Sequence, residues 1–248
     1  MDPSKIEPTN LGLRAAAALA RATHRPDAGT AGPTPDAAPS QSPAPDAAPP
    51  GRWADMMAAN PGHSAWYVER FRRMAASGTD LVGEARLVDA IAPRGARILD
   101  AGCGPGRHAG HLHRAGHTVV GVDLDPVLIE AAEADEPGPR YVVGDLTVVA
   151  LPDDAPAEFD VISCAGNVMT FLHPDTRRPI LRRFASWLAL GGRAVVGFGA
   201  GRGYPFEEFL ADAAASGLGR HQLFSSWDLR PLEGSSDFIV ALLSRDRD

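Results

Sequence analysis

Short apolar runs alternate with amphipathic stretches through most of the chain after residue 51, and this pattern predicts strands that alternate with helices. Strands are expected near residues 97–101, 118–123, 140–144, 159–165, 193–199, 220–227 and 238–243. Apolar residues at helical spacing predict helices over residues 53–74, interrupted at Asn60-Pro61-Gly62, and over residues 79–92. Strands connected through helices form a mostly parallel sheet with helices on both faces, so the pattern indicates an α/β fold.

The first fifty residues lack this alternation. Between Pro26 and Pro50, fifteen of the twenty-five residues are alanine or proline. Prolines at this density remove backbone N–H donors and push the preceding residues out of helical geometry, so neither helix nor sheet propagates. We therefore expect residues 1–50 to form a disordered Ala/Pro-rich extension and residues 51–248 to form one folded domain. A secretory signal over Leu11–Ala22 is disfavoured, because arginines interrupt its apolar run.

Composition excludes several classes of protein. The 248 residues carry a net charge of −7 and contain only two cysteines. No apolar run approaches the roughly 18 residues that a membrane span needs, and two cysteines are too few for a disulfide framework. The excess of acidic residues disfavours a broad nucleic-acid-binding face. We therefore expect a cytoplasmic protein that acts on small molecules, with no membrane partner. Nothing in the sequence indicates an oligomeric state.

Two groups of basic or metal-ligating side chains are interpreted as lacking a special function. The histidines at 108, 111, 113 and 117 do not share one helical face and have no nearby cluster of acids or thiolates, so no metal site is expected. The arginines at 177, 178, 182 and 183 predict a solvated basic helix face, with an RNA-contacting patch as the alternative.

The residues after the first predicted strand favour a ligand-binding loop. The chain reads Asp100-Ala101-Gly102-Cys103-Gly104-Pro105-Gly106-Arg107. Alternate glycines let the backbone turn tightly and approach a ligand closely. Nicotinamide dinucleotide folds carry a similar loop, but the carboxylate of Asp100 would repel a pyrophosphate placed on the helix that follows. A cationic ligand is therefore favoured.

Acidic residues also follow the next two strands. Asp123 ends the second strand, where a carboxylate accepts hydrogen bonds from ribose hydroxyls. Leu124 offers an apolar surface for an adenine ring, and Asp145 could accept a bond from the adenine amino group. Each acid alone has an ordinary alternative, since Asp123 or Asp125 could cap the next helix and Asp145 could start a turn. Acids at three successive strand ends favour a shared site.

These segments together resemble the class I S-adenosylmethionine-dependent methyltransferases. The motifs that carry the resemblance are D-A-G-C-G-P-G-R (100–107), G-V-D-L-D (121–125), G-D-L (144–146), F-D-V-I (159–162) and L-A-L-G-G-R (188–193). The resemblance implies a Rossmann-like three-layer sandwich. Its seven-stranded, mostly parallel sheet has strand order 3-2-1-4-5-7-6, with the last strand antiparallel. It also implies S-adenosylmethionine as the cofactor.

The resemblance further implies which residues contact that cofactor. It places the methionine moiety against Asp100, Gly102 and Gly104, the ribose against Asp123, and the adenine against Asp145 and Leu146. The full set expected to bind the cofactor is Asp100, Gly102, Cys103, Gly104, Arg107, Asp123, Leu124, Asp145, Leu146, Cys164 and Tyr67. Two positions depart from the family pattern: Pro105 stands where a small hydroxyl residue is common, and Leu190 where proline is common.

Methyl transfer from a sulfonium is an in-line displacement, so positioning supplies most of the acceleration and a base is needed only for a protonated nucleophile. His173 and Asn167, which follow the fourth strand, are the candidate catalytic residues. The alternative for His173 is a cap before Pro174. Further candidates for closing over the cofactor are Trp66, Tyr67 and Arg70, and for an acceptor wall Phe198, Tyr204 and Phe206.

The resulting hypothesis is methyl transfer to N or O of a small-molecule acceptor. A cofactor-binding regulatory module without turnover, a protein or RNA methyltransferase, and a nicotinamide oxidoreductase are the alternatives.

Overall fold

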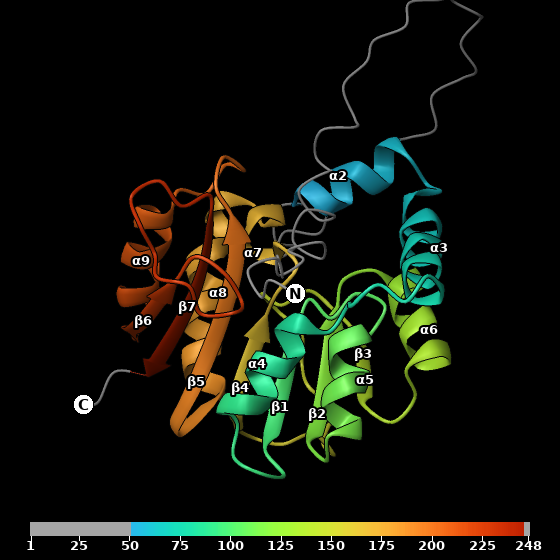
Figure 1. Cartoon of the computed structure of the whole chain (residues 1–248), viewed down its shortest axis with the longest axis horizontal. Helices are drawn as coiled ribbons and strands as arrows, with labels where there is room; N and C mark the ends of the chain where they lie inside the picture. Colours follow the sequence, from blue (N-terminus) through green and yellow to red (C-terminus); the bar gives the residue numbers. More distant parts are fainter. Residues whose placement is uncertain (1–50, 246–248) are drawn as a thin grey trace, which may run out of the picture. The chain divides into compact units, whose positions relative to one another are not determined.

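The computed structural model describes residues 51–245, without the side chains of residues 220 and 221. The extension expected over residues 1–50 lies outside the described residues and stays a prediction. Residues 51–245 build a central sheet of seven strands in the order β3-β2-β1-β4-β5-β7-β6, as the family resemblance implied (Figure 1). The strands are β1 (Arg97–Ala101), β2 (Thr118–Asp123), β3 (Arg140–Val143), β4 (Phe159–Cys164), β5 (Leu188–Gly199), β6 (Leu218–Phe224) and β7 (Phe238–Arg245).

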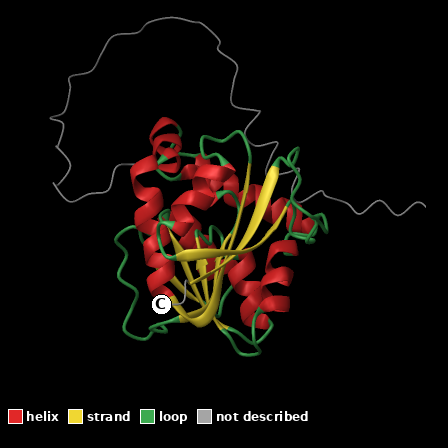
Figure 2. Cartoon of the chain, turned by 90° about the vertical axis from the view of Figure 1, so that its left-hand side faces the viewer, coloured by secondary structure: helices red, strands yellow, loops and turns green. Residues whose placement is uncertain are grey.

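Helices cover both faces of the sheet and complete a three-layer arrangement (Figure 2). They are α2 (Arg52–Ala59), α3 (His63–Ala76), α4 (Gly83–Ile91), α5 (Arg107–Arg114), α6 (Pro126–Asp135), α7 (Val168–Phe171), α8 (Pro174–Trp187) and α9 (Phe206–Ala214). Within residues 51–245, no helix combines the length and the apolar character that crossing a membrane requires.

The direction of the strands brings the predicted ligand-binding residues to one edge. β3, β2, β1, β4 and β5 pair in parallel, whereas β7 runs antiparallel to both β5 and β6. Parallel strands connected through helices end at the same edge of the sheet. The loops that follow β1, β2, β3 and β4 therefore lie beside one another.

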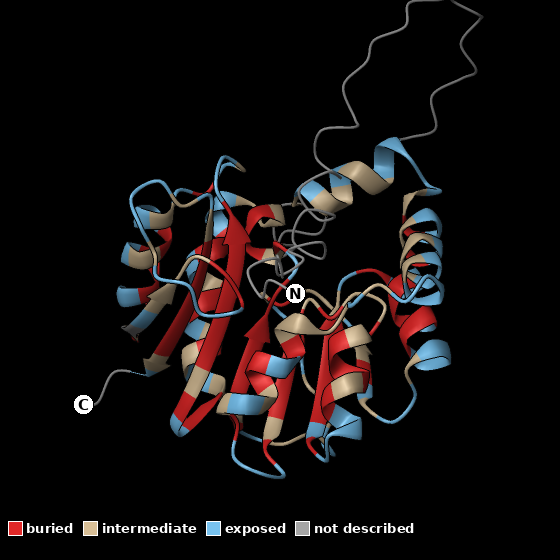
Figure 3. Cartoon of the chain, in the orientation of Figure 1, coloured by how far each residue is buried: buried red, intermediate tan, exposed pale blue. Residues whose placement is uncertain are grey.

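The core forms where apolar strand residues meet the helices. In Figure 3 the buried residues, drawn in red, lie mainly along the central strands. Phe198 and Tyr204 belong to this core, with ring centroids 5.8 Å apart and almost no exposed surface. The Tyr204 hydroxyl donates a hydrogen bond to Asp212 Oδ2 at 2.8 Å. The interpretation of Phe198, Tyr204 and Phe206 as an acceptor wall is therefore wrong. These rings pack the end of β5 against α9.

Two element boundaries differ from the sequence prediction for identifiable reasons. β5 begins at Leu188 and not near residue 193, because Leu188 already pairs with Phe159 before an irregularity in the register. α4 begins at Gly83 and not near residue 79. Asp80 Oδ1 accepts a hydrogen bond from the Val82 backbone N–H at 3.2 Å, which forms a turn ahead of the helix.

Of the four arginines expected to form a solvated face on α8, Arg178 and Arg182 are exposed, whereas Arg177 and Arg183 bind carbonyls of distant loops. Arg177 is buried and donates to Gly203 O at 2.6 Å and to Glu208 Oε1 at 3.0 Å. Arg183 donates to the carbonyl oxygens of Thr147 and Val149, which follow β3. The chemical reason is that a guanidinium offers five donors, enough to satisfy carbonyls that secondary structure leaves unpaired.

Candidate functional site

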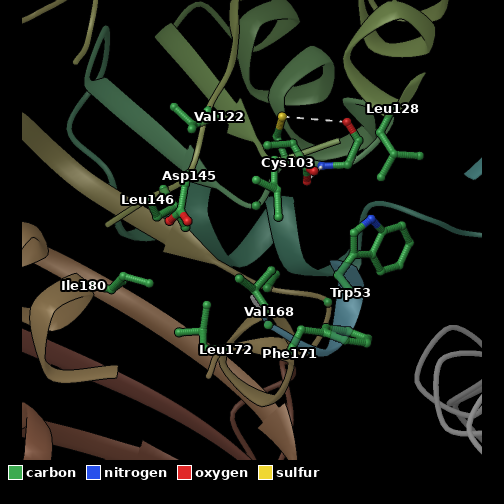
Figure 4. A pocket seen from close by; sticks show the side chains of 18 of the residues that line it. Trp53, Cys103, Val122, Leu128, Asp145, Leu146, Val168, Phe171, Leu172 and Ile180 are labelled. Atoms are coloured by element: carbon green, nitrogen blue, oxygen red, sulfur yellow. Dashed lines mark hydrogen bonds between the residues drawn. The ribbon is translucent and has the colours of Figure 1, made fainter. Parts of the chain in front are cut away.

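A cavity opens where the loops after β1, β2, β3 and β4 converge. Figure 4 shows Trp53 and Phe171 close together on one side of this cavity, with Asp145, Leu146 and Ile180 on the other. Most of the expected cofactor-binding residues line it, namely Gly102, Cys103, Gly104, Arg107, Asp123, Leu124, Asp145, Leu146 and Tyr67. Asp100 and Cys164 do not.

The glycines of the β1–α5 loop shape one wall. Gly102, Gly104 and Gly106 all have positive φ, at 81°, 54° and 79°. A Cβ on Gly102 would lie 2.3 Å from Val168 Cγ2, whereas a Cβ on Gly104 would meet no atom within 4 Å. Gly104 therefore faces the open cavity, and its lack of a side chain leaves that room for a ligand.

Asp123 is the most strongly constrained carboxylate of the cavity. Its Oδ2 accepts a hydrogen bond from the Gly104 N–H at 2.8 Å and its Oδ1 accepts one from the Asp125 N–H at 3.0 Å. Burial raises the pKa of Asp123 to about 6, and the neighbouring carboxylates of Asp125 and Asp100 add to this rise, although the two backbone bonds oppose it. A ligand hydroxyl that donates to Asp123 would stabilise its ionised form.

Asp145 and Leu146 lie on the side of the cavity opposite Trp53 and Phe171. The Asp145 carboxylate accepts two hydrogen bonds from described residues, both at Oδ1, from Thr147 N at 2.8 Å and from Thr147 Oγ1 at 2.7 Å. Leu146 is buried beside this carboxylate, and Ile180 of α8 lines the same side of the cavity. The arrangement offers an acceptor oxygen next to an apolar wall, which suits a purine ring that carries an amino group.

The structure places Asp100 and Cys164 behind the cavity wall. Asp100 is almost fully buried in β1, between Gly121 of β2 and Ser163 of β4. Burial raises its pKa, and its Oδ2 has no hydrogen-bond partner among the described residues. Cys164 is a buried free thiol in the main core. Both residues lie within their strands, whereas most of the cavity lining comes from the loops and helices that follow the strands.

Arg107 lines the cavity but is held by other residues. Its guanidinium donates to Leu81 O and approaches Glu84 Oε1 at 3.3 Å, and it lies 5.2 Å from the Phe71 ring centroid. Burial, the largest single influence on Glu84, favours its protonation. Arg107 and His108 nevertheless hold the pKa of Glu84 well below its usual value. Any contact between Arg107 and a ligand would share this guanidinium with Glu84.

Aromatic residues from three helices cover the cavity. Trp53 of α2 makes edge contacts with Tyr67 of α3 at 5.6 Å and with Phe171 of α7 at 5.7 Å between ring centroids. Burial raises the pKa of Tyr67. Trp66, by contrast, is 44% exposed and lies outside the cavity lining, as does Arg70. Of the three residues expected to close over the cofactor, only Tyr67 faces the cavity.

The two candidate catalytic residues differ in position. His173 lines the cavity and also caps α8, since its Nδ1 accepts a hydrogen bond from the Asp175 N–H at 3.3 Å. In a neutral ring with Nδ1 as acceptor, the proton resides on Nε2. Asn167 does not line the cavity. It has φ 68° and its Oδ1 accepts a bond from the Gly199 N–H at 2.8 Å, which ties the end of β4 to β5.

Sequence reasoning missed part of the cavity wall. The further lining side chains include Trp53, His108, Val168, Thr176 and Ile180. They come from α2, α5, α7 and α8, whose place over the strand ends depends on tertiary packing. One feature of the sequence indicated a role for Trp53. It is a large aromatic residue at the very start of the first predicted helix, where it must pack against another part of the fold. Among residues 51–245, no group of three or more His, Cys, Asp or Glu is placed to hold a metal ion.

Comparison with known proteins adds a sequence match over the same loops. A family model described as a methyltransferase domain matches residues 98–192. The ubiquinone biosynthesis O-methyltransferase of Paracidovorax citrulli (strain AAC00-1) is 39% identical over 83 residues, which are 31% of this chain and 34% of that protein. Matches to the first curated relatives cover only 29% to 50% of their lengths.

Solved structures match over a larger part of the chain. A TehB-like S-adenosylmethionine-dependent methyltransferase from Corynebacterium glutamicum ATCC 13032 is 51% identical, with a TM-score of 0.71. The match covers 75% of this chain and 100% of that one. The 1,6-didemethyltoxoflavin-N1-methyltransferase of Burkholderia thailandensis, solved with its acceptor and S-adenosylhomocysteine, is 20% identical with a TM-score of 0.53 over 85% of this chain and 95% of that one. The latter likeness shows the fold.

Proposed function

Because this chain belongs to the S-adenosylmethionine-dependent methyltransferases, we propose that it transfers the methyl group to a nitrogen or oxygen atom of a small-molecule acceptor. The observation that carries the proposal is the cavity in which Gly104, Asp123 and Asp145 face an aromatic wall. The ubiquinone biosynthesis O-methyltransferase and the 1,6-didemethyltoxoflavin-N1-methyltransferase named above support both kinds of acceptor atom.

The residues at the strand ends fit the cofactor. Gly104 leaves space where a side chain would stand, and Asp123 is positioned by two backbone N–H groups beside that space. Asp123 would accept the ribose hydroxyls, and Asp145 with Leu146 would hold the adenine. The acidic side chains also suit the positive charge of the sulfonium, which would repel a cationic wall.

The aromatic side of the cavity is where we propose the acceptor binds. Trp53, Tyr67 and Phe171 exclude water and offer flat apolar surfaces. When bound, the cofactor supplies a methyl group on positively charged sulfur, which departs neutral as the acceptor's lone pair forms the new bond. The protein's contribution is then to align the acceptor, and alignment of two reactants supplies a large share of such accelerations.

His173 is proposed as the polar group of the acceptor side. With Nδ1 used in the cap of α8, its Nε2–H is available to donate a hydrogen bond to the acceptor. To accept a proton at Nε2, the neutral ring would first have to carry its own proton on Nδ1. The Asp175 carboxylate lies 3.6 Å from Nδ1, on the side to which that N–H would point.

The test uses methyl-labelled S-adenosylmethionine and extract of the host cell, with the products separated by size. We expect label in the small-molecule fraction, and less of it when Asp123→Ala replaces the wild type. Label in protein or RNA would overturn the small-molecule acceptor. Cofactor binding without any labelled product would favour a regulatory module over an enzyme acting on extract components.

A further inference from the structure

Two of the helices that carry aromatic residues over the cavity, α2 and α3 (together called the cover), both bond to one carboxylate, that of Asp125. We propose that Asp125 is a positioning residue: it holds α2 and α3 over the cavity and connects their position to Asp123. The inference deepens the function proposed above, because it assigns how the methyl-transfer cavity is kept closed.

One carboxylate oxygen of Asp125, Oδ2, accepts hydrogen bonds from both helices of the cover. Trp53 Nε1 donates a hydrogen bond to Asp125 Oδ2 at 2.9 Å, and Ser64 Oγ donates to the same oxygen. Trp53 lies on α2 and Ser64 on α3, so a single atom receives both helices. Asp125 is 5% exposed and Ser64 is 1% exposed. Hydrogen bonds from neutral donors to a buried carboxylate are among the stronger ones in proteins.

The other polar atoms of Asp125 bond to α6 and to Asp123. Its Oδ1 accepts a bond from the Val127 N–H at 2.9 Å and caps α6. Its own backbone N–H donates to Asp123 Oδ1 at 3.0 Å. A helix cap needs only one carboxylate oxygen, so the cap explains Oδ1 and leaves the bonds at Oδ2 as a separate feature. Through its N–H, the residue that holds the cover also orients the carboxylate proposed to bind the ribose.

The cover has other contacts as well, including a hydrogen bond from Arg52 to Arg202 O at 2.9 Å and the Arg107 guanidinium 5.2 Å from the Phe71 ring. Trp53 and Tyr67 pack on a small apolar cluster of Val68, Leu128 and Ala131, which is distinct from the main core. At the far end of α3, Arg72 pairs with Asp135 at 2.8 Å, but both side chains are well exposed. Exposed ion pairs contribute little to stability. Elements with few buried contacts open most readily, so removal of the Asp125 bonds should loosen α2 and α3 first.

The experiment separates the bonds to the cover from the helix cap. Asp125→Ser keeps a hydroxyl that caps α6, because serine is as good an N-cap as aspartate, but it cannot hold Trp53 and Ser64 together. The double variant Trp53→Phe with Ser64→Ala removes the same two bonds from the other side and leaves Asp125 intact. Hydrogen exchange of residues 52–76 and calorimetric binding of S-adenosylhomocysteine are measured for wild type and both variants.

We expect both variants to speed exchange in α2 and α3 by about tenfold or more and to weaken S-adenosylhomocysteine binding several-fold. Exchange in α6 and in β4 should stay as in wild type. Unchanged exchange in residues 52–76 in both variants would overturn the proposal. So would a uniform rise of exchange across the sheet in both, since that would indicate general destabilisation.

The same data keep this proposal distinct from the proposed function. If wild type fails to bind S-adenosylhomocysteine, the proposed function fails, while the exchange of α2 and α3 still tests the role of Asp125. If wild type binds and the variants differ from it only in exchange, the connection to Asp123 is wrong.

Discussion

Asp123 shows how one residue combines binding geometry with an electrostatic constraint. Two backbone N–H groups fix both of its oxygens, yet it lies next to other carboxylates in a buried position. Its pKa of about 6 means that the carboxylate is charged at neutral pH only by a small margin. Hydroxyl donors of a ligand favour the charged form, so ligand binding and ionisation of Asp123 are linked.

This linkage sets the expected pH dependence of cofactor affinity. Because the pKa of Asp123 is raised to about 6, the free protein holds the binding-competent carboxylate above that pH and loses it as the pH falls below. At pH 5, about ten protonated molecules exist for each ionised one, so affinity should be about tenfold weaker than at pH 7.5. Calorimetry with S-adenosylhomocysteine, which carries no sulfonium, measures the effect.

The control for the pH dependence is Asp123→Asn, whose affinity should be low and the same at both pH values. Equal affinity of the wild type at pH 5 and pH 7.5 would show that the ionisation of Asp123 does not control binding.

His173 has a structural role that can be separated from its proposed contact with the acceptor. Its Nδ1 caps α8, and asparagine is also a strong N-cap. His173→Asn should therefore unfold with nearly the wild-type free energy, whereas His173→Ala should lose about 1 kcal/mol. Denaturant unfolding measures both. If the asparagine variant is as unstable as the alanine variant, the cap is not what the imidazole contributes.

At the scale of elements, the loop between β1 and α5 must pack closely against α7 and must also leave room for a ligand, and a different glycine meets each requirement. Gly102 packs against Val168, whereas Gly104 faces the open cavity. Both residues adopt positive φ. The loop is thus closely packed at its first glycine and open at its second.

Alanine at these two positions should separate stability from binding. Gly104→Ala adds only the strain of a left-handed residue, about 1 kcal/mol, but its Cβ occupies the cavity and should weaken cofactor binding at least about tenfold. Gly102→Ala adds an overlap with Val168 to the same strain and should lose about 3 kcal/mol of stability. Thermal unfolding and S-adenosylhomocysteine titration of both variants test this. The reverse order of stability losses would contradict the packing described.

Element positions followed from sequence wherever local pattern dominates. The alternation of apolar runs predicted β1 and β2 at their observed bounds, because a buried strand needs an apolar run whatever surrounds it. The early start of β5 was not predictable, since Leu188 joins the sheet only through its pairing with Phe159. Likewise, the arginines of α8 gave no local sign that they would bind the carbonyls of distant loops.

At the scale of the whole molecule, the strand order brings residues far apart in sequence to one cavity. Gly104, Asp123 and Asp145 were predicted to meet because parallel strand ends share an edge. Trp53 was not predicted as part of the cavity wall, because its helix reaches the cavity through tertiary packing and through the bond of Trp53 to Asp125. Sequence therefore indicated the cofactor side of the cavity better than the acceptor side.

The central claim is that this cavity binds S-adenosylmethionine through carboxylates at the strand ends. The most direct test is calorimetric titration of wild type and Asp123→Ala with S-adenosylmethionine at pH 7.5. We expect one molecule bound per wild-type chain and an affinity at least about tenfold lower, or about 1.4 kcal/mol, in the variant. No binding by the folded wild type at millimolar ligand, or equal affinity of the two proteins, would contradict the claim.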